Sequence, residues 1–329
     1  LIDKEALKKF RDKALNPMKP ATYGTAQNDD IYFQATEARN KYYDAIPDIV
    51  NEYMEAINNK AGTNYKPFNY YGSNTAKRVI VAMGSVCEAI KETIDKLNED
   101  IGLIEVHLYR PFSTKYLLEV LPNTVESIAV LDRTKEPGSN GEPLYLDIVS
   151  ALSAKNIKVV GGRYGLSSKN TTPSQIYAVY EMLKNPRHNF TIGIVDDVTN
   201  LSLEPIEITT SNSDECLIYG YGSDGMVSAA KSIIKMIGNN TDKYVQGYFQ
   251  YDSKKSGGVT ICNLRISDKP INAPFYVTNP GIVVLTKDEY LFKFDMIDDI
   301  KDISLNQIHI KQEILIEKRK EVYIYGRKK

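Results

Sequence analysis

The sequence predicts an α/β protein of two domains, each built on a mostly parallel sheet flanked by helices. Three observations predict this fold class. Short Val- and Ile-rich runs alternate with amphipathic segments, polar residues interrupt the pattern between residues 205 and 214, and a new strand, glycine loop and helix follow. Apolar runs of this kind are typical of parallel strands covered on both faces. The length of 329 residues suits two or three domains of roughly 100–200 residues.

Residues 1–68 are expected to form helices joined by a loop, ahead of the first sheet. The second helix has apolar residues at helical spacing, which predicts one packed face. They are Ile46, Ile49, Val50, Tyr53, Met54 and Ile57. A polar run with one glycine at residues 58–64, followed by Pro67, is typical of a linker.

Residues 69–207 read as successive β-α-β units, and we expect them to form one parallel sheet. Two loops directly follow predicted strands, at residues 132–138 and 161–165. Loops beyond the carboxyl ends of parallel strands are where α/β sheets place ligands. The charged side chains of the first loop could equally pair with one another on the surface. The glycines of the second indicate a close approach to a partner.

Residues 208–329 begin a second unit of the kind that binds mononucleotides. A strand, ECLIYG, leads into the loop GYGSDG and a helix, MVSAAKSIIKMIG, for which Gly238 is a plausible C-cap. A second strand, KYVQGYFQY, precedes the loop DSKKSGG, and further strands are expected within APFYVTNPGIVVLT and VYIYG.

The glycine loop of this second unit is the strongest chemical signal in the sequence. Gly220, Gly222 and Gly225 have the spacing G-x-G-x-x-G between a strand and a helix. Such glycines let backbone N–H groups approach a phosphate at the helix N-terminus. The motif alone is weak, because a glycine-rich turn can simply pack closely.

Two adjacent lysines strengthen the case for a phosphate. Lys254 and Lys255 precede Ser256 and Gly257 after the second strand, where an NAD site would have an acid for the ribose hydroxyls. Lysines there suit an additional phosphate, which favours NADP or coenzyme A over NAD. The alternative is a solvated surface pair.

Several function classes find no support in the sequence. The net charge of -1 provides no field for nucleic acid or an anionic membrane, and the 23 tyrosines are scattered without a basic groove. No apolar run approaches the roughly 18 residues of a spanning helix. The three cysteines lack metal-site spacing and are expected to be reduced core thiols. His107 is expected to be structural and His188 a solvated loop residue, so we predict no catalytic residue and no metal ligand.

Many long strings of the sequence resemble pyruvate:ferredoxin (flavodoxin) oxidoreductases. Residues 1–68 resemble the end of that family's first domain, residues 69–207 its second domain, which is similar to the transketolase C-terminal domain, and residues 208–329 its gamma-type, Rossmann-like third domain. The strings are GTAQNDDIYFQATEARNKYYDAIPDIV, RVIVAMGSV, VHLYRPFS, AVLDRTKEPG, GEPLY, GGRYGL, TTPSQI, NFTIGIVDDVT, YGYGSDGMVSAAKSIIKMIG and GYFQYDSKKSGGVT. The sequence departs from the family pattern at Ala230, where we expect Asn between Ala229 and Lys231.

The resemblance implies an enzyme that oxidatively decarboxylates pyruvate to acetyl-CoA and CO2. Thiamine diphosphate, Mg and 4Fe-4S clusters are implied for the full-length enzyme but not for this chain, which we therefore expect to be an internal fragment that is inactive alone. Coenzyme A is the ligand implied for the third domain. The positions that match the coenzyme A motif are Gly222, Ser223, Asp224, Gly225, Lys254, Lys255, Ser256 and Gly257.

The implied partners are the remaining domains of the same polypeptide and a second subunit in a homodimer. The implied electron acceptor is ferredoxin, flavodoxin, or NADP through a fused flavin reductase, and the implied location is the cytoplasm, with a hydrogenosome or related organelle as a variant. Two other readings of the residues stay open. One is a stand-alone nucleotide- or coenzyme A-binding module, and the other is a structural scaffold for dimerisation.

Overall fold

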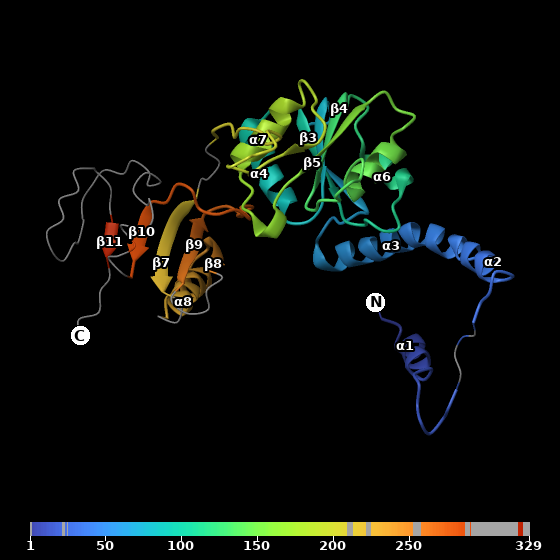
Figure 1. The fold of residues 1–329 in the computed structure, drawn as a ribbon. Helices are drawn as coiled ribbons and strands as arrows, with labels where there is room; N and C mark the ends of the chain where they lie inside the picture. Colours follow the sequence, from blue (N-terminus) through green and yellow to red (C-terminus); the bar gives the residue numbers. More distant parts are fainter. Residues whose placement is uncertain are drawn as a thin grey trace. The chain divides into compact units, whose positions relative to one another are not determined.

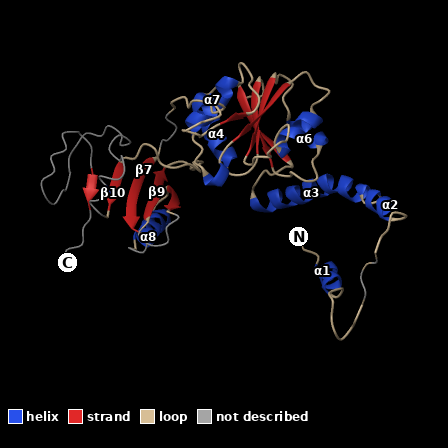
Figure 2. Ribbon diagram, viewed as in Figure 1, coloured by secondary structure: helices blue, strands red, loops and turns tan. Residues whose placement is uncertain are grey.

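The computed structural model describes residues 2–21, 24, 26–208, 213–221, 225–252, 258–286, 290 and 322–324. The chain divides into two compact units, of which one combines Leu1–Tyr71 with Ile104–Asn123 and the other Gly72–Leu103 with Thr124–Lys329. Two sheets are formed, one from strands between residues 68 and 191 and one from strands after residue 213 (Figures 1 and 2). None of the described helices has the length and apolar character needed to cross a membrane.

Helices dominate the first 61 residues, as expected. They are α1 (Lys4–Arg11), α2 (Tyr32–Glu37) and α3 (Asn40–Ala61). The Asp3 side chain caps α1 by accepting hydrogen bonds from the Glu5 and Ala6 N–H groups, and α3 ends at Gly62 with φ 68°.

The apolar stripe of α3 is not packed as the sequence predicted. Ile49 is 47% exposed, Tyr53 52% and Ile57 41%, while Ile46, Val50 and Met54 are half-buried. Helical spacing of apolar residues identifies a face but not what covers it, so the pattern overstated the burial of this helix.

The first sheet has six strands in the order β1-β3-β2-β4-β5-β6. The pairs β2–β4, β4–β5 and β5–β6 are parallel, as the alternation of apolar runs and helices predicted. The strands are β1 (Phe68–Gly72), β2 (Arg78–Ala82), β3 (Ile101–Val106), β4 (Ser127–Asp132), β5 (Lys158–Arg163) and β6 (Phe190–Thr191), and the connecting helices are α4 (Val86–Leu97), α5 (Thr114–Val120), α6 (Pro143–Ala151), the 3-10 turn Leu166–Ser168 and α7 (Pro173–Met182).

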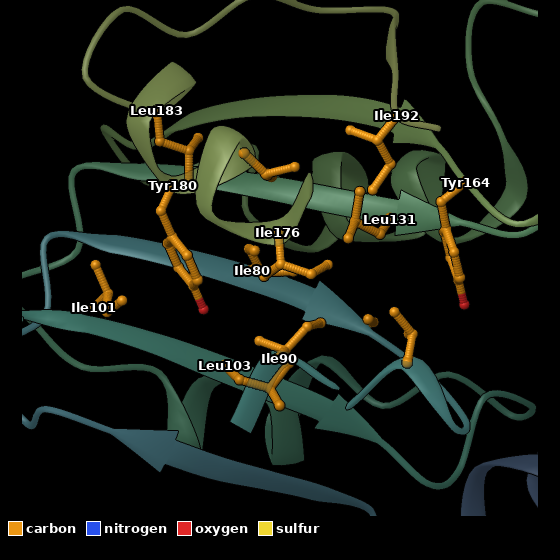
Figure 3. Packing of buried hydrophobic residues seen from close by; sticks show 14 of the residues in the cluster. Ile80, Ile90, Ile101, Leu103, Leu131, Tyr164, Ile176, Tyr180, Leu183 and Ile192 are labelled. Atoms are coloured by element: carbon orange, nitrogen blue, oxygen red, sulfur yellow. The ribbon is translucent and has the colours of Figure 1, made fainter. Parts of the chain in front are cut away.

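Helices α4 and α7 cover one face of β2, β4 and β5, and α6 lies on the other face (Figure 2). Figure 3 shows the cluster that α4 and α7 close, in which Ile80 and Leu131 of the strands meet Ile90 and Ile176 of the helices, all 1% exposed or less. Burying an aliphatic side chain contributes about 1.5–3 kcal/mol, so this layer stabilises the sheet strongly. The Tyr180 hydroxyl within it donates to the Gly102 carbonyl oxygen at 2.9 Å.

The second sheet has five strands in the order β11-β10-β7-β9-β8. Strands β10 and β11 run parallel to β7, whereas β9 pairs antiparallel with both β7 and β8. The elements are β7 (Asp214–Tyr221), α8 (Met226–Asn240), β8 (Tyr244–Tyr251), β9 (Val259–Ser267), β10 (Ile282–Leu285) and β11 (Val322–Ile324). The predicted α/β fold class is confirmed.

Two details of the second sheet differ from the sequence-based expectation. The strands β7 and β8, joined by α8, are not neighbours, because β9 lies between them. The sequence analysis did not single out residues 259–267 as a strand. Gly238 does not end α8, which continues to Asn240 and is followed by Thr241. A Cβ at Gly238 would lie 3.0 Å from Val245 Cγ2, so this glycine permits close packing of α8 on β8.

The paired glycines of β5 have a packing role. A Cβ at Gly162 would lie 2.2 Å from Phe190 Cζ, and one at Gly161 would lie 2.8 Å from Tyr145 Cγ. Phe190 is fully buried. At Gly161 and Gly162 the close approach is therefore made by aromatic rings of this same chain.

We predict that Gly162→Ala lowers the free energy of unfolding by about 1–3 kcal/mol, because the added methyl group must displace a buried ring. Urea denaturation followed by circular dichroism measures this cost. Adding Phe190→Leu should make the two costs less than additive, because a smaller side chain leaves room for the methyl group. Strict additivity of the two substitutions would contradict this explanation.

Candidate functional site

The predicted phosphate loop follows β7. Leu217, Ile218 and Tyr219 are buried in this strand, which ends at Tyr221, and α8 begins five residues later at Met226. Gly225 is the N-cap of α8 and has φ 88°, a left-handed conformation that side chains with a Cβ rarely adopt. A Cβ there would meet nothing within 4 Å, so the backbone conformation, and not space, favours glycine.

The predicted lysine loop joins β8 to β9. Tyr251 pairs with Thr260, and the Asp252 N–H donates to the Val259 carbonyl oxygen at 3.2 Å, so residues 252–258 connect two antiparallel strands. Val259 also pairs with Tyr221, the last residue of β7. The loop after β7 and the β8–β9 connection therefore leave the sheet at the same edge, even though they are about 30 residues apart in sequence.

Most of the predicted site residues cannot be placed individually. Of the eight, the structure describes Gly225. The other seven, which lie outside the described residues, are Gly222, Ser223, Asp224, Lys254, Lys255, Ser256 and Gly257. What the structure provides is the position of the strands and the helix that carry both loops.

The end of β10 lies at this edge too. Leu285 pairs with Tyr219, and the next residue, Thr286, donates from its N–H and its hydroxyl to the Tyr219 carbonyl oxygen at 3.1 and 3.2 Å. Parallel strands β7 and β10 thus end together. The carboxyl edge of a parallel strand pair, beside a helix N-terminus, is a position suited to an anionic ligand.

A buried ion pair lies at the opposite edge of the second sheet. Arg265 Nε donates to Glu215 Oε1 at 2.7 Å, and these side chains are 1% and 3% exposed. Arg265 Nη1 also donates to the carbonyl oxygens of Ala273 and Phe275 at 3.2 and 2.8 Å. Because Glu215 and Arg265 are register partners on β7 and β9, the pair fixes the alignment of the two strands. The sequence analysis missed it, although Arg265 interrupts an apolar run and Glu215 directly precedes one.

We expect the double substitution of this pair to lower the free energy of unfolding by less than the two single substitutions added together. Glu215→Leu or Arg265→Met alone should each lower the free energy of unfolding by about 3–5 kcal/mol. The first variant leaves the Arg265 charge buried without its partner, and the second leaves the Glu215 charge. The double variant should cost at least about 1 kcal/mol less than the two singles together. A double-mutant cycle in urea denaturation measures the coupling, and additive costs would rule out a stabilising pair.

The loop after β4, singled out from the sequence, is largely structural. The Asp132 carboxylate accepts hydrogen bonds from the Leu144 and Tyr145 N–H groups, both at 3.1 Å, and so caps the N-terminus of α6. Burial raises the pKa of the Asp132 carboxyl, and these two N–H donors oppose the shift. Arg133 Nε donates to the Gly165 carbonyl oxygen at 2.8 Å. These contacts join both side chains to backbone groups of this chain and not to one another, so they differ from the surface pairing of charges that was the alternative to a ligand loop.

The histidines and cysteines mostly behave as expected. His107 Nδ1 lies 3.0 Å from the Lys66 carbonyl oxygen, as for a satisfied structural histidine. His188 is exposed, but its Nδ1 accepts from the Gly161 N–H at 3.1 Å and its ring stacks on Tyr145, so it is held in place and not freely solvated. Burial raises the pKa of the Cys216 thiol to about 11, which makes it unreactive at neutral pH. Within the described part of the chain, no three His, Cys, Asp or Glu side chains gather as a metal site.

Asp197, in the loop after β6, is held as a carboxylate. It accepts hydrogen bonds from the Thr199 hydroxyl at 2.6 Å, the Thr199 N–H at 3.0 Å and the Ser202 N–H at 2.5 Å. These donors, with the Thr199 hydroxyl first, lower the pKa of the Asp197 carboxyl from 3.8 to about 2. The contribution of the Asp197 carboxylate to the stability of the folded state is therefore complete above pH 3.8 and is lost as the pH falls through about 2.

We predict that carboxyl-carbon NMR titration finds Asp197 still ionised at pH 3. Thr199→Val should raise the pKa of Asp197 toward its ordinary value, because the strongest donor is lost. Thr199→Ser, which keeps the hydroxyl, should leave it low. An Asp197 pKa that is equal in the Val and Ser variants would contradict the assigned cause.

Two family models match the chain. Residues 215–311 match the model described as pyruvate ferredoxin/flavodoxin oxidoreductase, and residues 76–176 match pyruvate:ferredoxin oxidoreductase core domain II. These ranges include most of the second and first sheets respectively.

Individual relatives match over most of this chain. The pyruvate-flavodoxin oxidoreductase of Enterobacter agglomerans is 48% identical over 312 residues, which cover 92% of this chain and 27% of that protein. The pyruvate:ferredoxin oxidoreductase of Moorella thermoacetica is 49% identical over 311 residues, with the same coverages of 92% and 27%. The pyruvate dehydrogenase (NADP⁺) of Cryptosporidium parvum is 47% identical over 312 residues, covering 90% of this chain and 16% of that protein. The chain therefore spans between a sixth and about a quarter of the length of these relatives.

Proposed function

Because the chain belongs to the pyruvate:ferredoxin (flavodoxin) oxidoreductase family, we propose that it is an internal part of such an enzyme that binds coenzyme A and provides scaffold. The whole enzyme would decarboxylate pyruvate oxidatively to acetyl-CoA and CO2. Its electrons would pass to ferredoxin, flavodoxin or NADP, the three acceptors that appear in the names of the relatives.

The single observation that carries the coenzyme A proposal is the shared edge of the second sheet. The glycine loop after β7 and the lysine loop after β8 flank the start of β9, since Tyr221 and Tyr251 pair with its first two residues, Val259 and Thr260. Strands β7 and β8 are two strand spacings apart, about 10 Å. A ligand with two separated phosphate groups could therefore contact both loops.

Coenzyme A has such groups, a diphosphate and a ribose 3′-phosphate. Backbone N–H groups around Gly225, at the N-terminus of the 15-residue helix α8, suit the diphosphate. Lys254 and Lys255 on the second loop suit the 3′-phosphate through charge-assisted hydrogen bonds. The other proposed contributors are Gly222, Ser223, Asp224, Ser256 and Gly257.

The redox and decarboxylation chemistry is proposed to lie in other parts of the enzyme. A 4Fe-4S cluster needs four cysteine ligands, and the sequence contains three separated cysteines. The thiamine-binding motif expected in the family is not found in it. The residues present therefore do not fit either cofactor, and the chain by itself is expected to be inactive.

The domain division stays part of the proposal. Residues 1–68 would complete the first domain, residues 69–207 would form the transketolase C-terminal-like scaffold, and residues 208–329 would form the gamma-type domain. We also propose that the whole enzyme is a homodimer and that it is located in the cytoplasm or in a hydrogenosome.

Titration calorimetry of the 329-residue chain with coenzyme A tests the site. Lys254→Ala/Lys255→Ala should weaken binding about tenfold or more, since hydrogen bonds to charged groups contribute about 1.5–3 kcal/mol. Dephospho-coenzyme A, which lacks the 3′-phosphate, should bind the unaltered chain as weakly as coenzyme A binds the double variant.

The matched control is Lys235→Ala/Lys243→Ala, which removes the same charge from α8 and from the residue before β8 begins. It should leave the affinity unchanged. The proposal would fail if the chain gave no binding heat and the full-length enzyme carrying the Lys254 and Lys255 changes kept its KM for coenzyme A. If both double variants lost the same affinity for coenzyme A, the weakening would be explained by the change in net charge alone.

A further inference from the structure

A cleft of about 690 Å³ lies in the part of the chain that forms the first sheet. Its walls come from the end of β5, the turn that follows it, β6 and the loop after β6. It therefore occupies the carboxyl edge of parallel strands, where α/β sheets place ligands. Its volume is within the range of roughly 300–1,000 Å³ found for small-molecule sites.

Cations outnumber carboxylates in this cleft. Arg163 is 7% exposed and shares the buried carboxylate of Glu142 with Lys135, each at 3.6 Å. Lys169 is exposed, and no described acidic side chain forms an ion pair with it. Asp196 is the carboxylate of the lining, and Lys135 and Arg163 share Glu142, so Lys169 is the lining cation left without an ion-pair partner among the described residues.

A buried hydroxyl in the wall of the cleft lacks a partner. Thr191 is 7% exposed, and its backbone is fully used, because its N–H donates to the Leu201 carbonyl oxygen and its own carbonyl accepts from the Leu203 N–H. Its Oγ1 has no hydrogen-bond partner among the described residues. An unsatisfied buried polar group costs about 1–3 kcal/mol, and a ligand oxygen would remove that cost.

Much of the remaining lining is apolar, although Asn189 and Thr199 also belong to it. Tyr164 and Ile192 are buried beneath the cleft, whereas Leu166 is 44% exposed and Ile194 47% exposed at its rim. Covering such side chains with hydrocarbon contributes about 25 cal/mol for each Å² removed from water. A mainly apolar lining with a few converging polar groups is typical of a site for a small organic ligand.

We propose that this cleft binds a small amphipathic monocarboxylate. The carboxylate lies beside Arg163 and Lys169 and accepts a hydrogen bond from the Thr191 hydroxyl. The hydrocarbon body lies against Ile192 and Ile194. A single cation without an ion-pair partner among the described residues, Lys169, favours a monoanion over a phosphate dianion. The site uses residues of the first sheet and its loops, and it does not depend on the proposed coenzyme A site.

Octanoate is a suitable probe, with octan-1-ol and inorganic phosphate for comparison. Calorimetry on the 329-residue chain should show saturable binding of octanoate, binding of octan-1-ol that is about tenfold weaker, and no binding of phosphate. Lys169→Gln should weaken octanoate binding about tenfold, and Thr191→Val about threefold to tenfold, because each removes one polar contact. Thr191→Ser should restore it.

Lys158→Gln is the matched control, because Lys158 is an exposed lysine at the amino end of β5, opposite the cleft. It should bind octanoate as the unaltered chain does. The proposal is overturned if octanoate shows no saturable binding, if octan-1-ol binds equally well, or if Lys158→Gln weakens binding as much as Lys169→Gln. Thermal melting establishes whether each variant folds. If Thr191→Val does not fold, Lys169→Gln still tests the proposal, because Lys169 is exposed.

Discussion

The second sheet depends on the burial of Arg265 against Glu215. Both charges are almost inaccessible to water, so neither strand can shift without leaving an unpaired charge in a medium of low polarity. A slip of one residue between β7 and β9 would also turn every side chain of one strand to the opposite face. The pair therefore fixes β9 against β7, and β9 also pairs with β8, so the loops that follow β7 and β8 leave the sheet at one edge.

Both proposed ligand sites lie at the carboxyl ends of parallel strands. In the first sheet, helices close the faces and leave Arg163 and Thr191 in a cleft beyond β5 and β6. In the second, the ends of β7 and β10 meet beside the N-terminus of α8. The two proposed sites differ in chemistry, since the first combines Lys169 with partly apolar walls and the second combines a glycine loop with two lysines.

Relatives named for three different electron acceptors match this chain at 47% to 49% identity. The matched region is therefore shared by proteins that differ in acceptor. The similarity is consistent with the proposed role in coenzyme A binding and scaffolding, because that role does not depend on the acceptor.

The sequence by itself determined the α/β class, most strands and helices, and the family, because apolar periodicity and motif strings are local properties of the chain. It also indicated Gly225 correctly as part of a turn, although seven of the proposed site residues lie outside the described part of the structure. Only the tertiary structure decided that β9 separates β7 from β8, that Gly162 makes room for Phe190, and that Thr191 has an unpartnered hydroxyl. Each of these depends on residues distant in sequence, whose contacts are fixed by packing and not by local pattern.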